Sequence, residues 1–290
     1  MSELGSEGSF GVLGPVAAWR HGRPLALGSP QQRTVLALLL MHRNRVVATD
    51  RMVDVLWPVG GAPSARPVVR TYVSRLRRCL ESLDATLVTT SHGYELQVAA
   101  DQVDADRFES MVIAGRDARQ AGDLAAGAGL LRQALGLVRG EILTELQDDR
   151  VACLERARLA EVRLIAEEEL VEVELATGRH RALVPRLTAA VAEDPLRERA
   201  WMQLMVALYR SGRQADALEA YRRASRALAD ELGLVPGREL QRLERMILVH
   251  DRALDLPAPP GAGLPRCRTK SSVGSASARW SRRRCSRDAW

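Results

Sequence analysis

The segment RTYVSRLRRCL, residues 70–80, combines a basic face with an apolar one. The residues that a helical period places on the apolar side are Val69, Val73, Leu76, Leu80 and Leu83. The other side and its flanks hold four arginines and two short hydroxyl residues, which are Arg70, Arg75, Arg77, Arg78, Thr71 and Ser74. Guanidinium groups bind phosphate or the O6 and N7 atoms of guanine, and short side chains let a helix approach base edges. The segment therefore suits a helix that enters a nucleic-acid groove.

A solvated amphipathic helix is the alternative interpretation of this segment. Exposed helical faces usually mix charge signs through pairs three or four residues apart. Here only Glu81 offers a nearby acidic partner. The excess of positive charge favours contact with a polyanion.

Two further helices and a hairpin are predicted around the basic segment. Ser29 and Pro30 predict the start of a first helix through QQRTVLALLLMH. Thr49 can cap a second helix through DRMVDVLW, and Ser64 can cap the third, basic helix, which we expect to run to about Leu83. Short apolar runs before residue 28 and the segment LVTTSHGYELQV predict strands. This order is typical of a winged helix-turn-helix, whose third helix lies in the major groove.

The turn of the predicted hairpin is polar and adds candidate contacts. Thr89 to His92 precede Gly93, while Tyr94 is expected to point inward and Trp57 to belong to the core. Such a wing can contact phosphate or the minor groove, and an ordinary hairpin turn is the alternative for each residue. The candidate DNA-binding residues are Arg66, Arg70, Thr71, Ser74, Arg75, Arg77, Arg78, Thr90 and His92.

Strand signals disappear after Asp104, and helical periodicity continues to about residue 250. Three segments resemble one another: AGDLAAGAGLLRQAL, TGRHRALVPRLTAAV and SGRQADALEAYRRAS. Their glycines, Gly122, Gly178 and Gly212, predict turns between paired helices, and the 34-residue spacing of the last two is the tetratricopeptide period. We expect a mainly α protein, with a tetratricopeptide-like solenoid of about three helical pairs after the winged helix.

Charge is unevenly distributed along the 290 residues, although the net charge is +6. Residues 1–100 have 11 basic and 7 acidic side chains, residues 101–256 have 23 and 28, and residues 257–290 have 8 and 1. A basic N-terminal part favours a nucleic-acid partner there. The Pro/Gly-rich LPAPPGAGLP and the Ser/Arg-rich residues after it predict a disordered tail over 257–290, which either adds DNA affinity or is inert.

Enzymatic chemistry is not expected. The histidines are isolated, neither HExxH nor GxSxG occurs, and GSEGSFG lacks the Lys-Ser/Thr of a phosphate loop. The cysteines, Cys79, Cys153, Cys267 and Cys285, lack paired or metal-ligand spacing and are expected to be reduced. No metal or other cofactor is expected. The acidic run EEELVEVE, residues 167–174, is interpreted as a solvated helix face, with a weak docking surface as the alternative.

A cytoplasmic location is expected from the apolar patterning. The N-terminal MSELGSEGS lacks the apolar core of a signal peptide. The longest apolar run, VLALLLM, is far shorter than the roughly 20 residues of a membrane span. No membrane partner is expected.

Several segments together resemble the SARP family, the Streptomyces antibiotic regulatory proteins. They are FGVLGPV, QQRTVLALLLMHRNRVVATDRMVDVLW, TYVSRLRRCL, HGYEL, DADRFE and ALYRSGRQADALEAYRRASRALADELGLVPGRELQRLERMIL. The resemblance runs from about residue 10 to 256. It implies an OmpR-like winged-helix DNA-binding domain over 1–99 and a bacterial transcriptional activator domain over 100–256, before the 257–290 tail.

The resemblance also implies a function. Members are expected to bind double-stranded promoter DNA at direct repeats near the −35 element, as head-to-tail dimers, and to recruit RNA polymerase holoenzyme to secondary-metabolite (antibiotic biosynthesis) gene clusters. A nucleoid-associated, non-enzymatic activator is implied, and the loop PVGGAP, residues 58–63, would face the polymerase. The alternative is a helical-repeat scaffold whose winged domain binds protein rather than DNA.

Two departures from the family pattern stand out. Members commonly have Asn-Thr-Leu-Gln early in the recognition helix, where this chain has Pro67, Val68, Val69 and Arg70. Arg70 in place of Gln is expected to alter base preference or to turn a base contact into a phosphate contact. Longer members continue after a PAPP-like linker into an ATPase domain, whereas LPAPPGAG is followed here by an unrelated Arg/Ser stretch.

Overall fold

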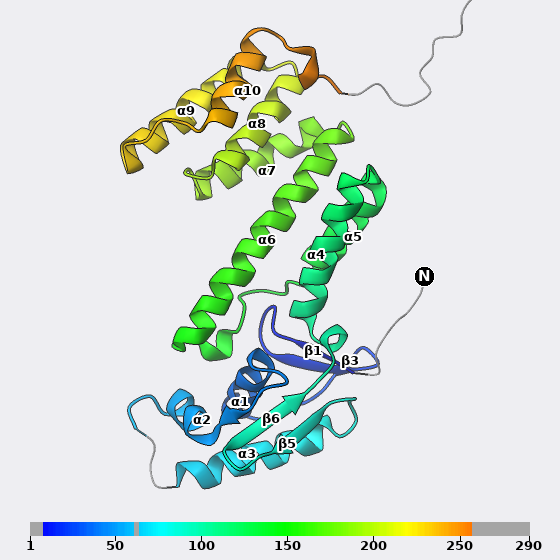
Figure 1. The fold of residues 1–290 in the computed structure, drawn as a ribbon, viewed down its shortest axis with the longest axis vertical. Coiled ribbons are helices and arrows are strands. Elements are labelled where there is room, and N and C mark those ends of the chain that lie inside the picture. The colour runs from blue at the N-terminus through cyan, green and yellow to red at the C-terminus, as the bar shows by residue number, and fades with distance from the viewer. Residues whose placement is uncertain (1–7, 61–63, 257–290) are drawn as a thin grey trace, which may run out of the picture. The chain divides into compact units, whose positions relative to one another are not determined.

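The computed structural model describes residues 8–60 and 64–256 (Figure 1). The predicted tail over 257–290 and residues 61–63 of the PVGGAP loop lie outside the described residues. The mainly α fold class is confirmed, with a winged helix-turn-helix followed by paired helices.

A small antiparallel sheet begins the fold. Its strands are β1 (Gly8–Gly11), β2 (Ala17–Arg20) and β3 (Arg23–Pro24). Phe10 pairs with Ala18, and Trp19 pairs with Pro24. The RHGR segment, residues 20–23, forms the turn between β2 and β3, in which His21 and Gly22 both have positive φ, 48° and 74°.

Three helices follow, with boundaries that partly correct the prediction. They are α1 (Pro30–Met41), α2 (Thr49–Leu56) and α3 (Ala65–Leu80). Ser29 caps α1 as predicted, in a capping box with Gln32. Thr49 was the wrong cap for α2, because Ala48 holds the N-cap position and no side chain caps that end.

The basic helix is also shorter than predicted. It ends at Leu80, and the next residues turn so that the Leu83 amide donates to the Leu80 carbonyl at 2.9 Å. Ser64 occupies the N-cap position of α3, but its side chain makes no capping hydrogen bond. Leu83 is still buried, since the turn carries its side chain back onto the same core.

The wing is a three-stranded sheet rather than a bare hairpin. Its strand order is β4–β6–β5, formed by β4 (Val47–Ala48), β6 (Gly93–Gln97) and β5 (Thr86–Thr89). Two-residue β4 carries no periodic signal, so the sequence did not predict it. Gly93 is required at this junction, because a Cβ there would lie 1.9 Å from the Val47 carbonyl oxygen.

The rest of the described chain is helical. Its helices are α4 (Asp104–Gln120), α5 (Leu124–Gly136), α6 (Arg150–Ala176), α7 (His180–Glu193), α8 (Glu198–Arg210), α9 (Gln214–Leu232) and α10 (Arg238–Leu248). Gly122, Gly178 and Gly212 have φ of +87°, +82° and +78°, which confirms their predicted place in the turns of α4–α5, α6–α7 and α8–α9. No helix in the described ranges is long and apolar enough to cross a bilayer.

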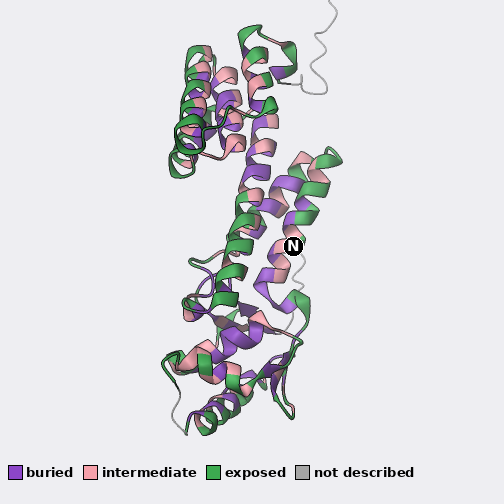
Figure 2. Cartoon of the chain, turned by 60° about the vertical axis from the view of Figure 1, so that its left-hand side comes forward, coloured by how far each residue is buried: buried purple, intermediate pink, exposed green. Residues whose placement is uncertain are grey.

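Two hydrophobic cores meet on α6. The first contains residues of the winged helix, α4 and α5 together with α6 residues up to Val173. The second begins at Val171 and continues through α7, α8, α9 and α10. In Figure 2 the C-terminal half of α6 is largely buried, whereas much of its N-terminal half is exposed.

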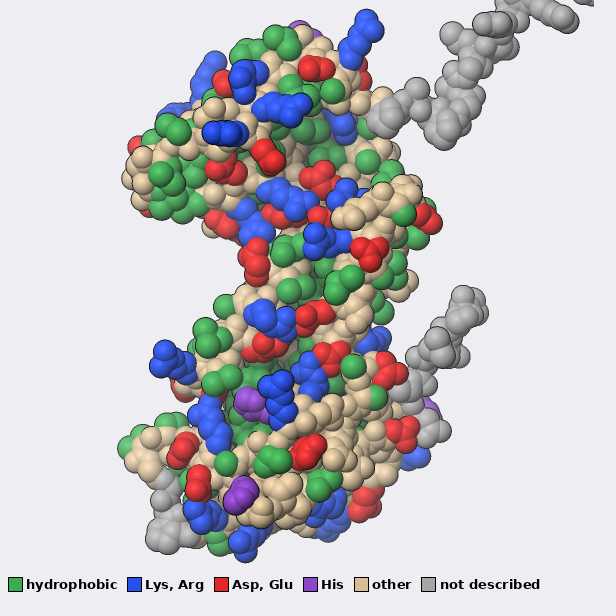
Figure 3. Space-filling view, viewed as in Figure 1, with side chains coloured by type: hydrophobic (Ala, Val, Ile, Leu, Met, Phe, Trp, Pro, Cys, Tyr) green, Lys and Arg blue, Asp and Glu red, His purple; other side chains and the backbone are tan. Residues whose placement is uncertain are grey.

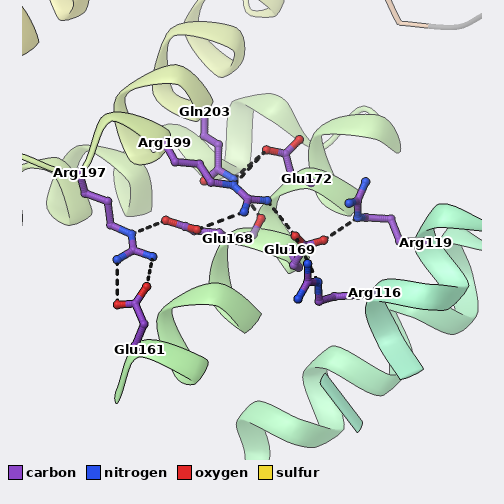
Figure 4. Close-up of polar contacts among 9 residues, drawn as sticks. All are labelled: Arg116, Arg119, Glu161, Glu168, Glu169, Glu172, Arg197, Arg199 and Gln203. Atoms are coloured by element: carbon purple, nitrogen blue, oxygen red, sulfur yellow. Dashed lines mark hydrogen bonds and ion pairs between the residues drawn. The ribbon is translucent and has the colours of Figure 1, made fainter. Parts of the chain in front are cut away.

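The acidic run 167–174 is not a solvated face, which corrects that expectation. Glu168 and Glu169 are only 7% and 2% exposed. Arg199 contacts both carboxylates, Arg197 pairs with Glu168, and Arg119 of α4 donates to Glu169 at 2.6 Å (Figure 4). These partners are 29 to 50 residues away in the sequence. The pattern of the run alone could not show that arginines of α4 and the start of α8 would cover it.

Carboxylates of the helical part also bind the winged helix. Asp104, at the start of α4, accepts the backbone N–H of Val12 at 2.7 Å and that of Leu13 at 3.1 Å. Asp149 caps α6 and pairs with Arg51 of α2. Burial raises the pKa of the Asp104 carboxyl, although the hydrogen bonds from the two backbone amides partly oppose this.

Candidate nucleic-acid interface

Helix α3 buries the apolar face that its sequence predicted. Val69, Val73, Leu76 and Leu80 are at most 1% exposed, and Leu83, beyond the helix end, is 5% exposed. This face packs against α1, α2 and β5. Its burial determines which side of α3 points outward.

The outward side of α3 has three arginines without a partner among the described residues. Arg70, Arg75 and Arg78 are exposed, and their side chains make no hydrogen bond or ion pair with the described residues. Ser74 is exposed among them, and Thr71 Oγ1 donates to the carbonyl four residues earlier at 3.1 Å. The three guanidiniums are therefore available to an external anion.

Arg66, in the first turn of α3, is already paired. Its Nε donates to Oδ1 of Asp50 at 2.9 Å, and its Nη2 donates to Oδ2 at 2.9 Å. Both side chains are open to solvent, 64% and 68% exposed. An ion pair so exposed contributes at most about 1 kcal/mol, so another anion can displace it.

Arg77 connects α3 to the wing. Its Nε donates to the carbonyl of Leu87 at 3.0 Å, and its Nη2 donates to Thr89 Oγ1 at 2.9 Å. Both acceptors belong to β5. Arg77 therefore positions the wing, and only the remainder of its guanidinium is free for a ligand.

The wing turn is fixed by its own hydrogen bonds. The Gly93 amide donates to Thr90 Oγ1 at 3.1 Å, and the Thr49 amide at the start of α2 donates to the His92 carbonyl at 3.2 Å. The Thr90 hydroxyl is thus used within the turn. The side chains of Ser91 and His92 are exposed and have no hydrogen-bond partner among the described residues.

An open polar hollow lies between α2, α3 and the wing. It is lined by Thr49, Asp50, Arg66, Arg70, Val73, Arg77 and residues 89–94. Five predicted site residues meet there: Arg66, Arg70, Arg77, Thr90 and His92. The other four, Thr71, Ser74, Arg75 and Arg78, are exposed on α3 outside the hollow. In Figure 3, basic side chains gather along the edge of the molecule over α3.

Sequence reasoning gave no site role to Asp50, the acidic residue of this lining. No pattern indicates that it meets Arg66, because the two residues are 16 positions apart and on different helices. The only signal was its place in the first turn of a predicted helix. The arrangement suits binding of an extended anion, and the described residues contain no cluster of His, Cys, Asp and Glu that could hold a metal ion.

Family models match both parts of the chain. Residues 22–96 match the transcriptional regulatory protein C-terminal family, and residues 103–248 match the bacterial transcriptional activator domain. A basic helix held between α2 and a wing, followed by paired helices, thus carries the two domain types that these family models describe for transcriptional regulatory proteins. The chain belongs to the SARP family, as its motifs indicated.

Individual relatives agree with this assignment. AfsR of Streptomyces coelicolor is 46% identical over 84% of this chain, and DnrI of Streptomyces peucetius is 35% identical over 86% of this chain and 94% of its own length. The chain spans about a quarter of the length of the AfsR relatives it matches. The structure of Mycobacterium tuberculosis EmbR in complex with a low affinity phosphopeptide has a TM-score of 0.77 at 36% identity, covering 87% of this chain and 66% of that one.

Proposed function

We propose that this chain is a DNA-binding transcriptional activator whose α3 lies in the major groove while the wing contacts the adjacent backbone. The observation that carries the proposal is a set of three arginines on the outward side of α3 that have no partner among the described residues: Arg70, Arg75 and Arg78. A helix exposing guanidiniums without acidic partners is matched to a polyanion, and Ser74 among them leaves room for base edges.

Salt dependence of duplex binding tests the proposal. If the α3 arginines and the wing neutralise about 4–6 phosphates per protomer, log K should fall with log[salt] with a slope of roughly −4 to −5. We expect this slope in fluorescence anisotropy titrations of the full chain with a labelled 30-base-pair duplex between 50 and 200 mM NaCl. No duplex binding at 50 mM salt, or a flat salt dependence, would contradict it.

The alternative class, a scaffold whose winged domain binds protein, predicts a different result. For such a scaffold, removing charge from α3 would not change duplex binding: the wild type and the variant would bind equally well, or neither would bind. The triple variant Arg70→Ala/Arg75→Ala/Arg78→Ala should instead reduce the magnitude of the salt slope by about three if each residue neutralises one phosphate. Since all three side chains are exposed, the variant should fold normally, as circular dichroism can verify.

Further parts of the proposal concern the promoter. Binding to direct repeats near the −35 element by head-to-tail protomers, followed by recruitment of RNA polymerase to a secondary-metabolite gene cluster, is supported by family membership. A footprint on promoter DNA should show two protected segments on one face of the duplex. Transcription in vitro with the polymerase holoenzyme should increase when the chain is added and should not increase with the triple variant.

A further inference from the structure

The hollow beside α3 contains an acidic residue where an anion is expected to bind. Of the residues that line it, Asp50 alone has a carboxylate, whereas Arg66, Arg70 and Arg77 are basic. Asp50 is not needed to neutralise a buried charge, because its side chain and that of Arg66 are both more than half exposed. Its contacts with Arg66 are nevertheless bidentate, the geometry that a phosphate would also use.

We propose that Asp50 competes with the DNA backbone for Arg66. This inference rests on the proposed DNA binding and concerns how that site is regulated. In the free protein, the Asp50 carboxylate occupies the guanidinium fork of Arg66. On DNA, a phosphate takes that fork, and Asp50 is left near the polyanion.

The competition weakens DNA binding that uses phosphate contacts alone. The penalty applies to every DNA sequence, because the backbone carries the same charge everywhere. Only a site that adds base contacts through α3 offsets it. Asp50 therefore lowers affinity for every duplex, whereas Arg70, Arg75 and Arg78 have no partner among the described residues and keep their full charge for DNA.

The variant Asp50→Asn tests this competition, because it removes the charge but keeps the size of the side chain. We expect its affinity for a 30-base-pair random-sequence duplex to rise about three- to tenfold at 100 mM NaCl, with a salt slope steeper by about one. Asp54→Asn is the matched control. Asp54 is exposed on the same helix, one turn further, so the same change of net charge should alter affinity less than twofold.

The higher duplex affinity of Asp50→Asn must also depend on Arg66. In the double variant Asp50→Asn/Arg66→Ala, the affinity should return to the wild-type value or fall below it. If the gain in affinity persists without Arg66, or if Asp50→Asn binds no more tightly than Asp54→Asn, the competition is refuted.

Asp50 lies in the first turn of α2, where its negative charge stabilises the helix N-terminus. Asp50→Ser, a second uncharged variant, should therefore show the same gain if Asp50→Asn folds poorly.

Failure of this inference can be told apart from failure of DNA binding itself. If wild type binds no duplex even at 50 mM NaCl, the proposed function fails. If wild type binds with the expected salt slope but Asp50→Asn is not tighter, only the competition fails. Because the penalty applies to every sequence, a duplex selected from random sequences by the wild-type chain should gain about as much affinity from the loss of Asp50 as the random duplex does. A gain confined to one of the two duplexes would contradict a competition with the backbone.

Discussion

Arg70 and Arg78 have the same free, exposed guanidinium but different expected roles. Arg70 lines the hollow with Arg66 and Arg77, close to the wing, where a phosphate contact is favoured. Arg78 lies outside the hollow on the exposed side of α3. The departure at Arg70 from the Gln common in the family therefore adds charge beside the backbone site.

Arg78→Ala should weaken binding to the cognate duplex by about 1–3 kcal/mol if Arg78 contacts a guanine, because a bidentate contact to a base is lost. Binding to a random duplex should change much less. Competition titrations with both duplexes measure the difference. An equal loss on both would assign Arg78 to the backbone. Arg242→Ala is the control for net charge, because Arg242 of α10 is exposed and has no partner within the described ranges.

Helix α6 is the element that joins the two hydrophobic cores, and ion pairs surround it where the cores meet. Glu169 accepts hydrogen bonds from Arg199 of α8 and Arg119 of α4, at 2.9 and 2.6 Å. Glu168 is bound by Arg197, and its backbone carbonyl accepts the Gln203 side chain at 3.0 Å. Figure 4 shows these side chains converging on α6 from α4 and from the chain at the start of α8. The network therefore connects three helices through neighbouring carboxylates.

Glu169→Ala should lower the free energy of unfolding by about 2–4 kcal/mol, since three arginines, Arg116, Arg119 and Arg199, lose a buried carboxylate but can still reach water. Urea denaturation measures the loss. Glu167→Ala is the matched control, because Glu167 makes only a surface pair with Arg163 and should cost less than about 1 kcal/mol. Equal losses in the two variants would show that the network contributes nothing beyond ordinary surface pairs.

The Glu169 contribution should also depend on pH. Burial raises the pKa of its carboxyl, but hydrogen bonds from Arg199 and Arg119 outweigh burial and hold the pKa below the usual value. A lowered pKa in the folded state means that the stabilisation is complete above about pH 4.3, the ordinary value for glutamate, and is lost as pH falls through the folded-state pKa. The stability gap between wild type and Glu169→Gln should therefore narrow as urea denaturation is repeated from pH 6 down to pH 3.

In the whole molecule, the winged helix and the helical part share one core and several polar contacts. The Val16 amide donates to Glu145 at 2.9 Å, and the Arg139 amide donates to the Leu13 carbonyl at 2.7 Å. The Arg139 guanidinium also lies 4.8 Å from the centre of the Trp19 ring. These contacts hold the β1–β2 connection against the chain between α5 and α6. The expected boundary between domains 1–99 and 100–256 separates the sequence motifs, but the contacts of Val16, Leu13 and Trp19 with residues 139–145 cross that boundary.

Asp104→Ala should destabilise the whole chain by about 2–4 kcal/mol, because two buried backbone N–H groups lose their acceptor. Asp104→Asn should cost less, since its amide oxygen still accepts a hydrogen bond. Asp101→Ala, which removes an exposed carboxylate three residues earlier, serves as control and should be near neutral. Urea denaturation should show one transition for all variants, and a separate early transition in Asp104→Ala would show that the winged helix unfolds independently.

The sequence by itself determined the helices, the glycine turns and the basic outward face of α3. These features depend on residues within one or two helical turns of each other: Ser29 with Gln32, Gly212 with the helix ends beside it, and the apolar period of Val69 to Leu80. The short strand β4 and the ends of α2 and α3 were not predicted. Strand β4 forms by pairing with β6, and the end of α3 is set by the turn after Leu80, so both depend on contacts beyond one or two helical turns.

Only the tertiary structure decided which charges are paired and which are free. Asp50 meets Arg66 across 16 residues, Glu169 meets Arg199 across 30, and Asp104 meets the Val12 amide across 92. A carboxylate finds its partner through the packing of elements distant in the chain, and that packing depends on apolar faces rather than on the charges themselves. Identical arginines on one basic helix thus became a paired Arg66, a structural Arg77 and an open Arg78.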